Sequence, residues 1–204
     1  LLPADVVKQI GKRHPLLIPP FTNDTLRRAV EDYLAGGARK ERIVDKYGEI
    51  NNWDVSNVTY MSEMFLGADG ALNSWNAKFN QPLNNWDVSN VTSMYRMFEG
   101  AGSFNQPLNN WNVSKVTNMD RMFASANSFN QPLNNWDVSN VTDMGEMFNG
   151  ATSFNQPLDN WNVSNVTDMV GMFESTRFNQ PRHAPWYHSS EESEDESDVD
   201  SDSE

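Results

Sequence analysis

The strongest constraint in this sequence is an internal 25-residue repeat. Trp86, Trp111, Trp136 and Trp161 recur at this interval, and Trp53 opens an earlier unit that is longer than the others. Each tryptophan begins the phrase W-[DN]-V-S-[NK]-V-T-x-M-x-x-M-F, and the first four phrases are followed by F-N-Q-P-L. All ten methionines of the chain lie in these phrases. Such a period indicates one structural unit built several times, in which neighbouring units bury each other's apolar residues.

The composition of one unit predicts its local structure. The stretch V-S-x-V-T is rich in β-branched residues, which favours one or two very short strands. The spacing of M-x-x-M-F places apolar side chains on one face of a short helical turn. The proline of F-N-Q-P-L prevents the helix from continuing, and the polar pair after it suits a turn. The sequence therefore predicts an α/β repeat solenoid, in which each 25-residue rung has short parallel strands and a short helical turn.

The repeat phrase resembles the BspA-like leucine-rich-repeat family, over roughly residues 47–181. Repeats of this family occur in bacterial surface proteins, in some protists and algae, and in large DNA viruses. The resemblance implies a leucine-rich-repeat-like solenoid that serves adhesion or protein interaction, and it implies no catalytic residues.

The two ends of the array depart from the repeat. Asn23 or Asp24 is expected to cap a helix over residues 25–34 that ends at Gly36 and Gly37. We interpret residues 1–46 as a helical N-terminal cap and residues 47–188 as five repeats with a C-terminal cap. Trp186 follows Trp161 at the interval of the repeat but without a following V-S-N-V-T phrase, so we expect it to close the C-terminal end.

Residues 189–204 form an acidic, serine-rich segment with nine of the 28 acidic residues and none of the 15 basic ones. Self-repulsion and a single apolar residue predict a disordered tail. It is either a solubilising tail or a docking element for a basic partner. Four serines have an acidic residue three positions later, a pattern that acidophilic kinases favour; these candidate phosphosites are Ser189, Ser193, Ser197 and Ser201.

The first unit carries eight extra residues between Phe65 and Phe79. Insertions in repeat arrays become surface loops, often on the binding face. Trp75 in this insertion is either an exposed anchor for a partner or a side chain folded back onto the cap.

The residue types argue against several functions. There is no cysteine and there are only three histidines, all outside the repeats, so a catalytic triad or a zinc site lacks its residues. We therefore expect no enzyme, no cofactor and no bound metal. Without the tail the charge is nearly balanced, which disfavours nucleic acid as a partner, and no apolar run is long enough to span a bilayer. One column suggests either a calcium ladder or side chains that cap the backbone, and we favour the second; its members are Asp54, Asp87, Asn112, Asp137 and Asn162.

Some columns vary from unit to unit while their neighbours repeat, as expected of a surface. They lie just before the first methionine and between the two methionines of each phrase. With Trp75 they predict the protein-binding surface, which comprises Tyr60, Glu63, Trp75, Ser93, Tyr95, Arg96, Asn118, Asp120, Arg121, Asp143, Glu146 and Asp168.

The sequence thus predicts a non-catalytic repeat protein that offers a protein-interaction or adhesion surface. The alternative is a structural component of a cell surface or viral particle, with the acidic tail as docking element. We expect a protein partner and a monomer unless the chain is part of a larger assembly. No signal peptide or wall-anchoring motif is present in this sequence, so an intracellular or virion-associated place is favoured over a bacterial cell surface.

Overall fold

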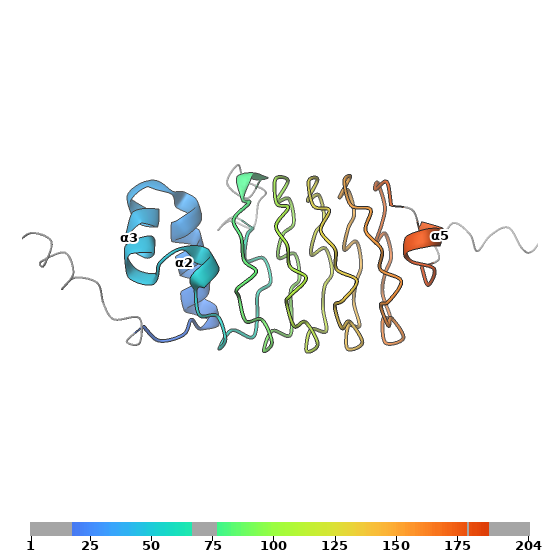
Figure 1. The fold of residues 1–204 in the computed structure, drawn as a ribbon, viewed down its shortest axis with the longest axis horizontal. Helices are drawn as coiled ribbons and strands as arrows, with labels where there is room; N and C mark the ends of the chain where they lie inside the picture. The colour runs from blue at the N-terminus through green and yellow to red at the C-terminus, as the bar shows by residue number, and fades with distance from the viewer. Residues whose placement is uncertain (1–17, 67–76, 179, 188–204) are drawn as a thin grey trace, which may run out of the picture.

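The computed structural model describes residues 18–66, 77–178 and 180–187. Helices α2 (Asn23–Ala35) and α3 (Gly37–Tyr47) lie at one end of the molecule, and the short helix α5 (Gln180–His183) lies at the other (Figure 1). A 3-10 turn, η2 (Ile50–Asn52), leads into the repeats. Between the ends the repeat units lie side by side in one row, each a loop of backbone with the same course (Figure 1).

The predicted leucine-rich-repeat-like α/β solenoid is wrong. Among the described residues the repeat units contain no named strand and no sheet, and the units are linked by isolated parallel bridges, such as Asn118 to Asp143. The M-x-x-M-F segment forms turns instead of a helix. Its third residue has a positive φ, for example 53° at Arg121 and 48° at Glu146, which an α-helix does not allow. The β-branched residues raise strand propensity, but the bend after each bridge limits pairing to one residue per unit.

Backbone hydrogen bonds nevertheless join every unit to the next. The amides of Met119, Arg121 and Phe123 donate to carbonyls of the following unit at 2.9 Å each. The corresponding amides of the other inner units do the same, and a threonine amide in each unit donates back, as Thr142 does to Thr117 at 2.9 Å. The polar backbone of these turns is therefore satisfied between units rather than within them.

The core consists of continuous columns of identical side chains. The tryptophan, valine, methionine, phenylalanine and leucine columns are almost fully buried in the inner units. Phe98, Phe123 and Phe148 stack with centroids 5.5 and 5.6 Å apart, close to parallel. Each tryptophan of this column also donates its Nε1 hydrogen to a backbone carbonyl that precedes it in the chain, as Trp136 does to Leu108 at 3.0 Å. The invariant tryptophan thus fills the core and satisfies a buried carbonyl with its one polar group.

Polar columns run along the stack beside the apolar ones. The side-chain oxygen of Asn105 accepts a hydrogen bond from the Asn130 amide at 3.0 Å and another from Gln131 Nε2 at 2.9 Å. The Asp/Asn column caps the backbone, as we favoured over a calcium ladder: Asp137 Oδ1 accepts from the amide and the hydroxyl of Ser139, at 3.1 and 2.6 Å. These hydrogen bonds lower the pKa of Asp137.

Side chains of helix α2 form hydrogen bonds with backbone groups at the N-terminal edge of the stack, where a preceding unit is missing. The cap of α2 is Thr22 rather than the predicted Asn23 or Asp24, because Thr22 and Thr25 form a reciprocal capping box. Asn23 has a different role: its Oδ1 accepts a hydrogen bond from the amide of Thr59 at 2.9 Å. In later units the equivalent threonine amide donates to the threonine carbonyl of the preceding unit. Arg27 donates a hydrogen bond to the Ser62 carbonyl at 2.6 Å. In the inner units the equivalent carbonyl accepts from a backbone amide of the preceding unit. Gly36 ends α2 as predicted, but the sequence analysis did not foresee α3.

At the C-terminal end Trp186 continues the tryptophan column. It stacks on Trp161 with centroids 6.2 Å apart and donates Nε1–H to the Leu158 carbonyl at 3.0 Å. Trp186 therefore closes the tryptophan column after the last phrase, but not the whole C-terminal end, where Val163 and Val166 are only partly buried.

Arg27→Ala is expected to destabilise the protein by about 1–2 kcal/mol, because the carbonyl of Ser62 loses a charged donor. The matched control is Arg28→Ala, which removes the same charge from an exposed position on the same helix. Urea unfolding of both variants tests this, and equal midpoints would contradict the capping role of Arg27.

Trp186→Ala is expected to lower stability by about 2 kcal/mol, roughly half the cost of truncating a fully buried tryptophan. The reason is the loss of the stack on Trp161 and of the bond to Leu158. Thermal unfolding measures it, with Val170→Ala as a control because that side chain is 72% exposed. An unchanged melting temperature would show that Trp186 does not close the stack.

Candidate functional site

The varied columns meet on one face of the stack, which we call the varied face. The column before the first methionine forms the line of bridges, with Tyr60, Ser93, Asn118, Asp143 and Asp168 each beside its neighbour in the next unit. The residues between the methionines lie next to this line. The binding residues predicted from sequence are therefore adjacent to one another, except for Trp75, which lies outside the described residues, as do the four candidate phosphosites.

The part of the varied face nearest α2 is aromatic and ion-paired. Tyr60 is exposed to 47%. Arg96 lies with its guanidinium 5.2 Å from the ring centroid of Tyr95, and its Nε is 3.0 Å from a carboxylate oxygen of Glu99. A more distant pair joins Arg96 to Glu63 at 4.0 Å. Burial raises the pKa of Glu99 against the lowering effect of Arg96.

The centre of the varied face is a hollow of about 390 Å³ around Gly145. Gly145 occupies a position where other units carry Ser62, Tyr95, Asp120 or Val170, so its missing side chain leaves space. A Cβ placed on Gly145 would lie 3.2 Å from Asp120 Oδ1, and carboxylate oxygens of two further aspartates would lie at 3.5 and 3.6 Å; these are Asp143 and Asp168. Three carboxylates from three successive units therefore surround one point.

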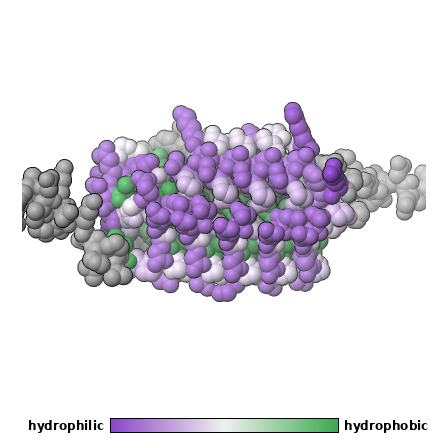
Figure 2. Space-filling model, in the orientation of Figure 1, coloured by the Kyte–Doolittle hydropathy of each residue, from purple (hydrophilic) through white to green (hydrophobic). Residues whose placement is uncertain are grey.

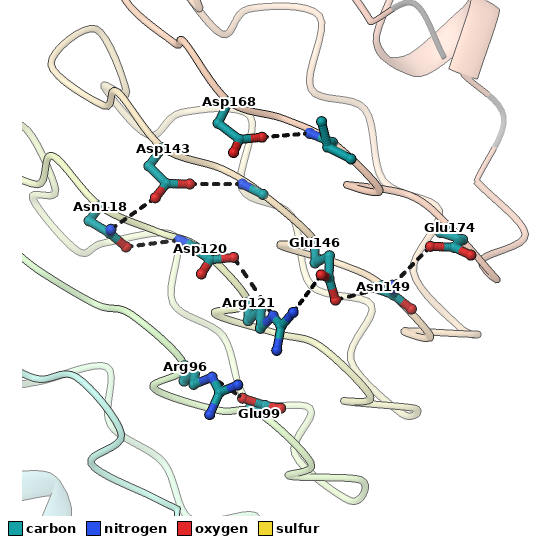
Figure 3. Close-up of polar contacts among 12 residues, drawn as sticks. Arg96, Glu99, Asn118, Asp120, Arg121, Asp143, Glu146, Asn149, Asp168 and Glu174 are labelled. Atoms are coloured by element: carbon teal, nitrogen blue, oxygen red, sulfur yellow. Dashed lines mark hydrogen bonds and ion pairs between the residues drawn. The ribbon is translucent and has the colours of Figure 1, made fainter. Parts of the chain in front are cut away.

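Two of these acids are held by backbone amides (Figure 3). Asp143 Oδ1 accepts from the Gly145 amide at 3.1 Å, and its other oxygen accepts from Asn118 Nδ2 at 3.1 Å. Asp168 Oδ1 accepts from the Val170 amide at 2.9 Å. The third acid, Asp120, has a longer ion pair, with its Oδ1 4.0 Å from Arg121 Nε. The backbone turn thus fixes the orientation of Asp143 and Asp168 before any partner binds.

The hollow has an excess of negative charge. Its lining contains four acidic side chains and one basic one, Arg121, which pairs with Glu146 at 2.5 Å. In this hollow the ionised form of Asp120 is disfavoured: burial raises the pKa of Asp120, and the charge of Asp143 raises it further. In Figure 2, hydrophilic residues run in rows along the stack with hydrophobic residues between them.

Two residues that shape the hollow belong to the varied columns but were not among the binding residues predicted from sequence. Gly145 is the one member of its column that lacks a side chain in the inner units. Val170, exposed to 72%, lines the hollow on the side of the last unit. A comparison of side-chain size along each column would have found both.

The repeats match a known family. The family model described as "Mycoplasma protein of unknown function, DUF285" matches residues 43–125 and 108–196. The chain belongs to this family. No curated protein and no solved structure matches this DUF285 chain. In the described ranges of the chain, no helix is long and apolar enough to cross a membrane.

Asp120→Asn is expected to raise the melting temperature of the DUF285 chain at pH 7. Its pKa is raised in the fold, so the protonated form is favoured and the ionised form costs stability at every pH above the ordinary value of 3.8. The gain should shrink as the pH falls to 3.8 and below, where the wild-type carboxyl is protonated as well.

Asp137→Asn is the matched control for this experiment, because the pKa of Asp137 is lowered. Its ionised form stabilises the fold above pH 3.8, so the substitution should give no gain at pH 7. Thermal unfolding at several pH values tests both variants. A gain of equal size in the two would contradict the crowding of carboxylates around Gly145.

Proposed function

We propose that this chain is a non-catalytic interaction protein and that the varied face binds a protein partner. One observation carries the proposal. The columns that differ between units lie together on this face, whereas the repeated columns form the core and the polar columns beside it. Columns with a structural task keep one residue type or exchange between two that can do the same task, such as Asp and Asn in the capping column. The wider freedom to differ marks the surface that is available for recognition.

The charge of the face suggests the chemistry of the partner. The hollow at Gly145 holds carboxylates that repel one another, and a cationic side chain would relieve that repulsion on binding. Arginine fits best, because its planar group forms paired hydrogen bonds with carboxylates and is enriched at protein interfaces. The aromatic and ion-paired region at Tyr60, Tyr95 and Arg96 would supply the adjoining contact area.

Family resemblance supports the same class of function. The repeat phrase is similar to that of BspA-like leucine-rich-repeat proteins, whose role is adhesion and protein interaction. The finer assignment to BspA-like repeats is part of this proposal, because the family match by itself gives only the DUF285 membership.

The proposal is tested by capture of a partner with three forms of the chain. The first is unaltered, the second carries Asp120→Asn, Asp143→Asn and Asp168→Asn, and the third carries three Asp→Asn changes in the column that caps the backbone, at Asp54, Asp87 and Asp137. Both variants lose three negative charges, and asparagine already occupies two positions of the capping column, at Asn112 and Asn162.

We expect the partner, identified by mass spectrometry and then purified, to bind the unaltered chain and the capping-column variant alike. Binding to the varied-face variant should fall by at least about tenfold, or about 1.4 kcal/mol. Equal loss in the two variants would show that only net charge matters, and full binding by both would place the interaction elsewhere.

A further inference from the structure

The hydrogen bonds that the M-x-x-M-F turns donate between units have one direction, and this leaves the last unit with free donors. In each inner unit the amides of the M-x-x-M-F turn donate toward the C-terminal end of the stack, as Met144, Glu146 and Phe148 do to the unit that follows. In the last unit the amides of Met169 and Gly171 have no acceptor among the described residues. Farther along the same turn the edge is covered, because Tyr187 of the C-terminal cap packs edge-on against Phe173 with ring centroids 5.0 Å apart.

The same edge exposes apolar side chains that are buried in every inner unit. Val163, Val166 and Met169 are only partly buried. Their counterparts one unit earlier are exposed to 1% or less; these are Val138, Val141 and Met144. Trp186 stacks on Trp161, and Tyr187 and His183 make edge contacts with the last phenylalanines, Phe173 and Phe178. The columns that end at Val163, Val166 and Met169 stay open within the part of the chain that the structure describes.

The opposite end of the stack is closed in a different way. There Arg27 donates to the outward carbonyl of Ser62, and the outward amide of Thr59 donates to Asn23. A second folded copy cannot stack its first unit onto the open edge, because helix α2 occupies the surface that would make the contact. The open edge therefore suits a segment of another protein rather than a second copy of this chain.

The electrostatics of the edge restrict that segment further. Asp168 is exposed at the end of the bridge line. Within the stack, Asp143 has a donor from the preceding unit, because Asn118 Nδ2 bonds to Asp143 Oδ2 at 3.1 Å, whereas Asp143 and Asp168 lie side by side as two acids. Glu174 belongs to the same last unit, and the acidic residues 189–204 follow in the chain. A donor or a cation in the partner segment opposite Asp168 would therefore bind to excess negative charge, whereas another carboxylate would add to it.

We propose that an extended, basic segment of a partner protein adds to this edge as a further unit, in parallel to residues 163–172. Its carbonyls accept hydrogen bonds from the amides of Met169 and Gly171, and its apolar side chains cover Val163 and Val166. This is strand-type addition to an exposed edge, in which the main chain supplies affinity and the side chains supply specificity. The site adjoins the hollow at Gly145 and shares Asp168 with it, but the amides of Met169 and Gly171 and the side chains of Val163 and Val166 lie outside the lining of that hollow. The proposal therefore holds whether or not the hollow binds a partner.

The chain itself provides two matched probes. A synthetic peptide of residues 111–125 contains the repeat phrase with Asn118 at the bridge position, together with Lys115 and Arg121. A peptide of residues 136–150 contains the same phrase with Asp143 at the bridge position and no basic residue. Fluorescence anisotropy of each labelled peptide with the full chain measures binding. We expect the first peptide to bind at least about tenfold more tightly, because Asp143 in the second would oppose Asp168.

Two variants locate the site. Val166→Lys places a charge among the edge valines and is expected to weaken binding of the first peptide by at least about tenfold. Asn165→Lys adds the same charge one residue away, at a column where Lys115 is already accommodated, and should change binding by less than about twofold. Equal effects of the two variants would overturn the proposal.

Amide hydrogen exchange on the unaltered chain gives a readout that does not depend on a variant folding. On peptide binding the amides of Met169 and Gly171 should exchange at least about tenfold more slowly, while Gly145 serves as an internal reference. Binding without this protection overturns the proposal. So does strong protection before any peptide is added, or binding that needs removal of residues 188–204, because each would show that this chain or a second copy covers the edge.

Discussion

The structure depends on a hydrogen bond that runs from one unit to the next in a constant direction. Amides of the M-x-x-M-F turn point toward the C-terminal end and carbonyls point toward the N-terminal end, in register with stacked phenylalanine and tryptophan columns. No unit satisfies these groups by itself, so the units are stable only as a stack. The direction also makes the two ends chemically different: one presents carbonyls and is covered by Arg27, and the other presents amides.

The same constraint explains where function can reside. Apolar columns of the core carry one residue type in the inner units, because a different side chain would disturb the packing on both sides. Freedom to vary is left to positions whose side chains point away from those ladders. The hollow at Gly145 arises from such a variation, since the loss of one side chain lets aspartates of three successive units converge. Different positions of the same 25-residue unit therefore serve stability and recognition.

Much of the candidate site followed from comparing units within the sequence. The residues predicted for the varied face, such as Asn118 and Asp143, lie side by side because equal positions in a periodic chain must align when units stack. The acidic hollow could not be predicted in this way, since it depends on how far the aspartates reach toward Gly145. The cap role of Asn23 and Arg27 also escaped prediction, because their partners lie far away along the chain, in the first repeat unit.

The sequence by itself determined the number of units, their buried columns and the residues that were free to differ, because a 25-residue period with every methionine in one phrase leaves little choice in what faces the core. Only the tertiary structure decided the backbone conformation of each unit. Propensity favoured strands and a helical turn, yet the chain forms turns with positive φ at Arg121 and its equivalents. The reason is that each turn directs its amides to the next unit, and contacts between units outweigh the weak preference of a few residues for strand or helix.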